Sequence, residues 1–455
     1  MSTLSTPVSD LEKQTISRVT RRLIPFLALL FIIAFLDRTN VGFAALRMNQ
    51  DIGISQTLYG FGAGIFFLGY FIFEVPSNIL MHRYGARIWI ARIMVTWGIV
   101  ASVMGLLQTS VHFIVLRAVL GVAEAGFFPG VIYLLSLWFP ARYRAQVIAG
   151  FYLGVPISQV IGAPLSASLI ELGEHIGVTG WRLMYVLEGL PAILLGVVCW
   201  FYLSDRPSEA RWLTDEQRNW LMRTLAAEEA AKPLAVGGGM SHGAQIRTVL
   251  KNRVVWAMAL TYFGITSGSN AMNFFFPSVL QSFQESFGIK LGLLQNGLIT
   301  AIPYALAGIV MFYWSKRSDR KQERHVHVAS AALLAAVSIA IALVVDHPLA
   351  TILGFTLLAI GVYSAVITFW AIPGQVLTGV GAAAGIGLIN SVGNLSGFVG
   401  PYLIGLIKTA TGSYTPGFLL IAALVGAGGV GALLLPRRPG SATMPIVTIE
   451  QRGDA

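Results

Sequence analysis

The sequence predicts an all-α integral membrane protein with twelve transmembrane helices in two six-helix bundles and both termini in the cytoplasm. Of its 455 residues, 55% are hydrophobic and only 11% are charged, and the mean hydropathy is +0.71. Soluble domains carry roughly 25% charged residues. Apolar segments of about the 20 residues that a span needs recur along the chain, and basic residues gather in alternate loops. A β-barrel is excluded, because its strands are short and alternate apolar with polar residues.

The apolar segments give the spans in chain order. We expect them at residues 23–45, 57–81, 88–108, 112–137, 145–170, 182–203, 254–280, 291–315, 327–345, 349–371, 381–408 and 416–435. The first segment follows a polar start and lacks a cleavage site, so we expect no signal peptide.

One long polar loop divides the spans six and six. We therefore expect a cytoplasmic N-terminal segment, a first bundle, a cytoplasmic loop, a second bundle and a cytoplasmic tail, at residues 1–22, 23–203, 204–253, 254–436 and 437–455. Within the loop, "EARWLTDEQRNWLMRTLAAEEA" has helical character, with Thr214 as a candidate N-cap. A flexible glycine-rich tether should follow it.

A faint repeat relates the two halves. His82 and Asp319 follow the second and eighth spans at an offset of 237 residues, and Pro164 and Pro401 show the same offset. Transporters often carry such duplicated bundles, with the substrate site between them near the membrane midplane. The 49 glycines agree with this, because small residues let helices pack closely.

The net charge of +10 follows the loops. The positive-inside rule places the basic loops in the cytoplasm, so we expect anionic lipid and not nucleic acid to face them. These loops hold Arg18, Arg21 and Arg22, then Arg83 and Arg87, Arg142 and Arg144, the 206–253 loop, Lys316, Arg317, Arg320, Lys321 and Arg324, and Arg437 and Arg438. Cys199 has no partner for an internal disulfide, and we see no Cys/His cluster spaced for a metal.

Ionisable residues inside the first and fourth spans are the main candidates for function. Asp37, Arg38, Arg117 and Glu124 lie within apolar segments, where each ion costs about 2.5–3.5 kcal/mol at the helix centre. Neighbouring residues on a helix do not face each other, so we expect Asp37 to pair with Arg117 and Arg38 to face a polar cavity. The alternative is that Asp37–Arg38 and Arg117–Glu124 are structural ion pairs with no role in transport.

Other candidates are weaker. Tyr70 and Glu74 lie in the second span, and Glu188 lies in the sixth. The second half offers neutral groups instead: Asn270, Asn273, Trp370, Asn390 and Asn394. Tyr70 and Trp370 fit a role in helix packing as well as they fit a role in substrate binding.

Four segments together resemble a known family. "FLDRTNVGFAAL", "RAVLGVAEAGFFPG", "WFPARYRA" and "YWSKRSDRKQER" look like the anion–cation symporter branch of the major facilitator superfamily. That branch includes bacterial permeases for phthalate, 4-hydroxyphenylacetate, tartrate and galactonate. The likeness covers roughly residues 20–436, and it implies alternating access and proton-driven uptake of organic anions.

The resemblance also implies roles for residues at matching positions. Asp37 and Glu124 would carry protons, Arg117 would link the two acids, and Arg38 would bind the substrate carboxylate. Tyr70 and Asn390 would line the substrate site, with Trp370 near it. From the residues themselves we add Arg117, Asn270, Asn273 and Asn394 as candidate substrate-binding residues.

We expect gating to involve Glu74, Arg83, Asp319 and Arg320. In "NILMHRYGAR" Asn78 and His82 replace the glycine and aspartate of the superfamily's usual loop motif, which puts an aspartate-based latch there in doubt. Ala163 stands before Pro164 where drug/proton antiporters have glycine, which counts against drug efflux.

The expected function is import of an organic carboxylate with protons across the bacterial inner membrane, by a monomer without a cofactor. The aromatic run Asn273–Phe276, with Tyr70 and Trp370, favours an aromatic acid such as phthalate or 4-hydroxyphenylacetate. A hydroxy acid such as tartrate or galactonate remains an alternative, as does an exchanger or exporter of the same fold. An enzyme is not expected, because the seven histidines are scattered in or near loops.

Overall fold

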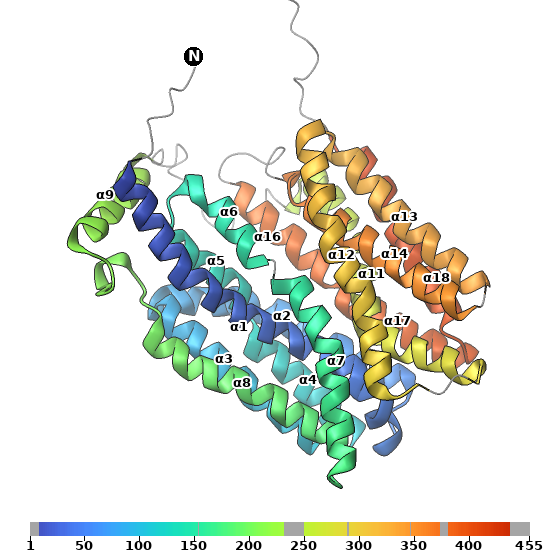
Figure 1. Ribbon diagram of the computed structural model, residues 1–455. Coiled ribbons are helices and arrows are strands. Elements are labelled where there is room, and N and C mark those ends of the chain that lie inside the picture. Colours follow the sequence, from blue (N-terminus) through green and yellow to red (C-terminus); the bar gives the residue numbers. More distant parts are fainter. Residues whose placement is uncertain are drawn as a thin grey trace, which may run out of the picture.

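The computed structural model describes residues 9–152, 154–231, 250–288, 291–345, 347–373 and 381–436. In these residues the chain forms helices and no strands, arranged as two groups that lie side by side (Figure 1). The glycine-rich tether and the tail 437–455 that the sequence predicts lie outside the described residues.

The first half runs from α1 to α8. Its helices are α1 Asp10–Asp51, α2 Gln56–Tyr84, α3 Ala86–Val103 with the short η1 Met104–Leu106, α4 Ser110–Glu124, α5 Phe127–Trp138, α6 Ala141–Tyr152, α7 Gly154–His175 and α8 Gly180–Tyr202. A connection with η2 Pro207–Glu209 and α9 Asp215–Ala231 follows. The second half holds α11 Arg253–Ser286, α12 Leu293–Lys321, α13 Arg324–Val345, α14 Pro348–Phe369, α16 Gly381–Asn394, α17 Ser396–Thr411 and α18 Thr415–Leu434.

Ten helices of the described chain are long and apolar enough to cross a membrane, with α4 and α5 counted together. α11 and the consecutive α16 and α17 lie at the remaining two predicted spans. α1 begins 13 residues before the predicted apolar segment, because the Ser9 side chain caps it by accepting a hydrogen bond from the Glu12 amide at 3.2 Å. Hydropathy therefore predicted only the apolar part of α1 and missed its polar first residues.

The two halves repeat one another in length as well as in sequence. α2 and α12 each have 29 residues. Their first residues, Gln56 and Leu293, and their last residues, Tyr84 and Lys321, are both separated by the 237-residue offset seen between the proline pair.

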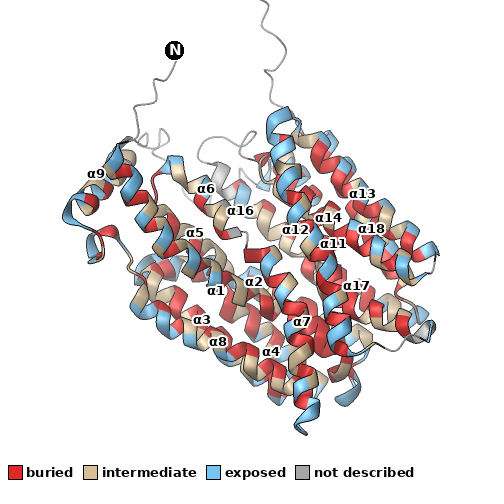
Figure 2. Cartoon of the chain, in the orientation of Figure 1, coloured by how far each residue is buried: buried red, intermediate tan, exposed pale blue. Residues whose placement is uncertain are grey.

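The halves meet along a seam at the end of the molecule opposite the start of α1 and the end of α18. A Cβ on Gly60 of α2 would lie 2.2 Å from the carbonyl oxygen of Pro401 on α17, so only glycine permits this approach. Thr57 donates to Thr409 at 2.8 Å, and the Tyr59 hydroxyl donates to the Phe274 carbonyl at 2.8 Å. Among described residues, the recorded hydrogen bonds between the halves all lie near this end. Figure 2 shows buried residues on the helix faces that meet neighbouring helices.

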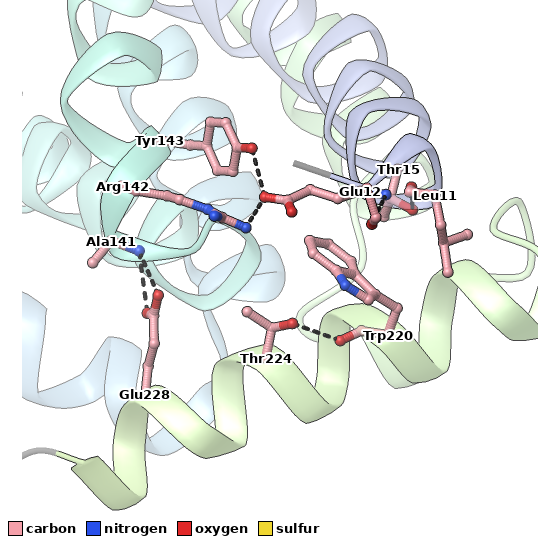
Figure 3. Close-up of polar contacts among 10 residues, drawn as sticks. Leu11, Glu12, Thr15, Ala141, Arg142, Tyr143, Trp220, Thr224 and Glu228 are labelled. Atoms are coloured by element: carbon pink, nitrogen blue, oxygen red, sulfur yellow. Dashed lines mark hydrogen bonds and ion pairs between the residues drawn. The ribbon is translucent and has the colours of Figure 1, made fainter. Parts of the chain in front are cut away.

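α9 packs against the first half, at the end where α1 begins. The predicted N-cap is confirmed, since the Thr214 side chain accepts from the Gln217 amide at 3.2 Å. Figure 3 shows Glu228 of α9 accepting hydrogen bonds from the Ala141 amide at the start of α6, at 3.0 and 3.1 Å. α9 therefore stabilises the first turn of α6 by occupying an amide that the helix itself leaves free.

Candidate functional site

A break in the fourth predicted span positions Glu124. The sequence predicts one helix over 112–137, but α4 ends at Glu124 and α5 begins three residues later. Gly126 takes φ +87°, and a Cβ there would lie 2.4 Å from Oγ of Ser77. The Ser77 hydroxyl donates to the Ala125 carbonyl at 2.6 Å, and Trp89 Nε1 donates to Ser77 Oγ at 2.9 Å. Neighbouring helices thus satisfy the backbone that the break frees, as a membrane interior requires.

Arg38 of α1 forms an ion pair with Glu124. Nη2 of Arg38 lies 2.5 Å from Oε1 of Glu124, which makes this a short, charge-assisted hydrogen bond. The Arg38 guanidinium also lies over the rings of Phe35, Phe66 and Tyr70, at 4.8, 5.4 and 5.7 Å from their centroids. The expectation that Arg38 faces a cavity without a partner is therefore wrong in this conformation, because the end of α4 brings a carboxylate to it.

The Arg38–Glu124 pair is uneven in its exposure. The Arg38 side chain is 21% exposed, whereas that of Glu124 is 1% exposed. Arg38 Nε and Glu124 Oε2 have no hydrogen-bond partner. Arg38 is therefore the more exposed member of the pair, and each member has one polar atom without a hydrogen bond.

Asp37 is held by neutral donors. Nδ2 of Asn40 and Nε1 of Trp97 each donate to its carboxylate at 3.2 Å. The expected ion pair with Arg117 is not formed, since no contact within 4.0 Å joins these two described residues. The Arg117 guanidinium is directed instead to the Ala63 carbonyl and the Phe66 ring.

Arg117 of α4 is buried with donors to spare. Its Nη2 donates to the Ala63 carbonyl at 3.1 Å, while Nε and Nη1 have no partner. Its guanidinium lies 4.8 Å from the centroid of Phe66, the ring that Arg38 also contacts. Both arginines thus share one aromatic face, which stabilises cations in an apolar setting. Sequence reasoning missed Phe66, because an apolar residue in an apolar span gives no signal.

Further buried polar groups lie close to Asp37. Glu188 of α8 accepts from the Ser166 hydroxyl at 2.7 Å, and its Oε2 has no partner. The Tyr185 hydroxyl is buried without a partner. The Thr39 hydroxyl donates to Oε1 of Gln159 at 2.6 Å. Glu188 and Tyr185 therefore add ionisable side chains to the group formed by Asp37, Arg38, Arg117 and Glu124.

The second half contributes half-buried amides. Nδ2 of Asn270 donates to the Thr266 carbonyl at 3.1 Å and to the Ser396 hydroxyl at 3.0 Å. The Tyr304 hydroxyl donates to Asn273 at 3.0 Å. The amides of Asn390 and Asn394 on α16 make no hydrogen bond to another described residue, which leaves them free for a ligand. Trp370 packs edge-on against Tyr262, with centroids 4.9 Å apart.

The expected aromatic surround at Asn273–Phe276 does not form. Phe274, Phe275 and Phe276 are fully buried. Phe274 meets Phe67, Phe275 meets Tyr59 and Tyr414, and Phe276 stacks on Phe355. These rings pack the helix interfaces instead of lining a site.

The predicted gating residues are not brought together. Glu74 is half-buried on α2, and Arg83 is exposed beside its neighbour Tyr84. Asp319 pairs with Arg324 at the start of α13. Gln322 adopts a left-handed conformation that turns the chain, and this brings the start of α13 back to the end of α12.

Comparisons with known proteins identify the family. Residues 27–401 match the family model described as the Major Facilitator Superfamily. The chain is 46% identical over 429 residues to a protein of Agrobacterium vitis named "Putative tartrate transporter", covering 94% of this chain and 96% of that one. It is 39% identical to a "Quinolone resistance transporter" of Acinetobacter baumannii, covering 92% of this chain and 94% of that one.

A solved structure supports the same fold. The inward-facing, unoccupied crystal structure of a bacterial homologue of the human lysosomal transporter Spinster matches with a TM-score of 0.73 at 16% identity, covering 94% of this chain and all of that one. The described residues hold no group of three or more His, Cys, Asp or Glu side chains placed to bind a metal. The chain belongs to the Major Facilitator Superfamily, and it is a multi-pass membrane transporter, not an enzyme.

Proposed function

We propose that the protein is a proton-coupled symporter that imports a small organic carboxylate across the bacterial cytoplasmic membrane by alternating access. The Arg38–Glu124 pair carries the proposal, because it joins a partly exposed cation to a buried carboxylate at 2.5 Å. A substrate carboxylate that binds Arg38 must compete with Glu124 for the same guanidinium.

Protonation of Glu124 settles that competition. When a proton binds its carboxylate, Glu124 becomes neutral and its hydrogen bond to Arg38 loses the charge assistance. The planar Arg38 fork is then free to meet a substrate carboxylate with two parallel N–H donors. Substrate binding and proton binding therefore favour each other, which is the requirement for symport.

Asp37 supplies a second proton site on this proposal. A dianion that enters alone against 100 mV, interior negative, costs about 4.6 kcal/mol. Two protons that travel with it cancel this cost, and each unit of pH gradient then contributes about 2.7 kcal/mol. Two buried carboxyl groups, Asp37 and Glu124, match that need.

The conformation supports a site open toward the cytoplasm. The halves are joined at the end opposite the start of α1 and the end of α18, and Gly60, Gly405 and Thr57 make close contacts there. The basic loops favour cytoplasmic termini. We therefore assign this structure to the inward-facing state of the transport cycle.

For the substrate we propose a hydroxy acid such as tartrate. The half-buried amides of Asn390 and Asn394 have no partner among the described residues, and they can bind hydroxyl groups. The expected support for an aromatic acid is weaker, because the phenylalanines of Asn273–Phe276 are packed between helices. The relative with 46% identity that carries a tartrate name supports the same choice.

Export is the second candidate, favoured by the 39% identical relative named for quinolone resistance.

Purified protein in proteoliposomes tests import against export, with labelled tartrate outside and an inward proton gradient imposed. We expect uptake to exceed equilibrium, to collapse with an uncoupler, and to be inhibited by tartrate more than by phthalate. Gradient-independent exchange, or proton-driven efflux of a quinolone, would contradict import.

A further inference from the structure

A pocket of about 800 Å³ lies where the polar start of α1 passes the end of α8 and the segment before α9. We propose that it binds the phosphate headgroup of an anionic phospholipid. Its lining includes Lys13, Arg18, Arg21, Arg22, Tyr202 and Trp212. The volume is in the range of small-molecule sites, and nothing in the transport cycle described above uses it.

The positive charge of the pocket is barely compensated. No acidic side chain is among the described residues that line it. Lys13 reaches Asp10 at 3.7 Å, but both side chains are largely exposed, so that pair is weak. The nearest buried carboxylate, Glu12, is engaged by Arg142 and Tyr143 of α6, as Figure 3 shows. Several cations therefore lack a carboxylate partner.

Aromatic residues fix one of these cations in place. The Arg22 guanidinium lies 4.5 Å from the Tyr202 ring centroid and 5.0 Å from that of Trp212. The Tyr202 hydroxyl donates to the Arg22 carbonyl at 3.0 Å. Arg22 Nε is buried without a hydrogen-bond partner. A guanidinium oriented in this way can meet phosphate oxygens through its two terminal nitrogens.

The surroundings favour a lipid over a soluble phosphate compound. The part of α8 that leads up to the pocket has an exposed apolar face. On this face Phe201 is 80% exposed, and Leu194 and Val197 are also exposed. Phe201 directly precedes Tyr202 of the pocket, and Tyr and Trp are typical of the headgroup level. A headgroup in the pocket would therefore place its acyl chains along this face. The positive-inside rule explains why basic residues lie in this region. It does not explain why several of them line the same pocket.

The test compares the wild type with the double variant Arg21→Gln/Arg22→Gln. Purified protein is titrated with phosphatidylglycerol, cardiolipin or phosphatidylcholine, and binding is followed by the melting temperature and by native mass spectrometry. Lys316→Gln/Arg317→Gln is the matched control, because it removes the same charge from exposed positions on α12. Inorganic phosphate and glycerol 3-phosphate serve as soluble competitors.

We expect the anionic lipids alone to stabilise the wild type, and the pocket variant to bind them about 30-fold more weakly, since each basic residue near the surface contributes about fivefold. The control should bind normally. Equal losses in both variants would reduce the effect to general surface charge, and tight binding of the soluble phosphates would assign the site to a soluble ligand. Should the double variant not fold, Arg21→Gln and Arg22→Gln singly should each weaken binding about fivefold. Unchanged affinity in both single variants would overturn the proposal.

Discussion

Glu124→Gln separates the proton-binding role of Glu124 from its size. Glutamine keeps the shape of the side chain and can accept a hydrogen bond from Arg38, but it cannot carry a charge or a proton. Hydrogen bonds to charged groups contribute about 1.5–3 kcal/mol, and neutral ones about 0.5–1.5 kcal/mol. The variant should therefore hold Arg38 more weakly by about 1–1.5 kcal/mol.

That difference predicts tighter binding at alkaline pH. A substrate that displaces the glutamine should bind about tenfold more tightly than one that displaces the ionised carboxylate, since about 1.4 kcal/mol corresponds to a factor of ten. At acid pH, where Glu124 in the wild type is protonated, the two proteins should bind alike. The Kd of the wild type should thus rise with pH, and that of the variant should stay nearly flat.

Isothermal titration of purified protein with tartrate between pH 5 and pH 9 measures this. Proteoliposomes give the matching transport result, in which substrate-for-substrate exchange persists in the variant and accumulation driven by a pH gradient fails. Glu174→Gln, an exposed carboxyl on α7 that pairs with Arg47, is the control and should retain the wild-type pH dependence. Parallel pH curves for wild type and Glu124→Gln would refute the competition between substrate and Glu124.

Three further changes test other parts of the account. Arg38→Ala should abolish substrate binding and Arg38→Lys should restore it only in part, because lysine lacks the bidentate fork; wild-type affinity in a titration of Arg38→Ala would remove this residue from the site. Gly126→Ala should lower the melting temperature, corresponding to at least about 1 kcal/mol, because its φ of +87° and the Ser77 hydroxyl 2.4 Å from the new Cβ both oppose a side chain; an unchanged melting curve would contradict the requirement for glycine. Gly60→Leu should force the halves apart at the seam, because its Cβ alone would lie 2.2 Å from a carbonyl oxygen of α17, and a cysteine placed at Thr57 should then react faster with an impermeant maleimide; an equal rate in the Gly60 parent would contradict the closed seam.

The sequence predicted the spans and the group of buried ions, because both depend on composition along single helices. It did not predict which ions pair. Asp37 and Arg38 leave α1 in different directions, and their partners depend on how α3 and α4 are turned toward them. The break at Gly126 ends α4 at Glu124 and so decides the pairing with Arg38. No spacing rule along one helix contains that information.

Aromatic residues show in two cases that sequence alone does not reveal which side chains lie at the site. Phe66 contacts both arginines although nothing in its local sequence marks it. The conspicuous run Phe274–Phe276 only fills helix interfaces. In an apolar span a ring beside a cation and a ring in the core have the same sequence signal, so only the packing of the helices distinguishes them.

Proton uptake on substrate binding tests the central claim most directly. Purified protein in weakly buffered detergent at pH 7–8 is mixed with tartrate at the same pH, and a pH-sensitive dye reports the protons that leave the solution. If binding to Arg38 requires Glu124 to be protonated, the wild type should take up about one proton more per tartrate bound than Glu124→Gln does. Binding by the wild type with no proton uptake, or the same uptake by both proteins, would contradict the exchange between Glu124 and substrate at Arg38.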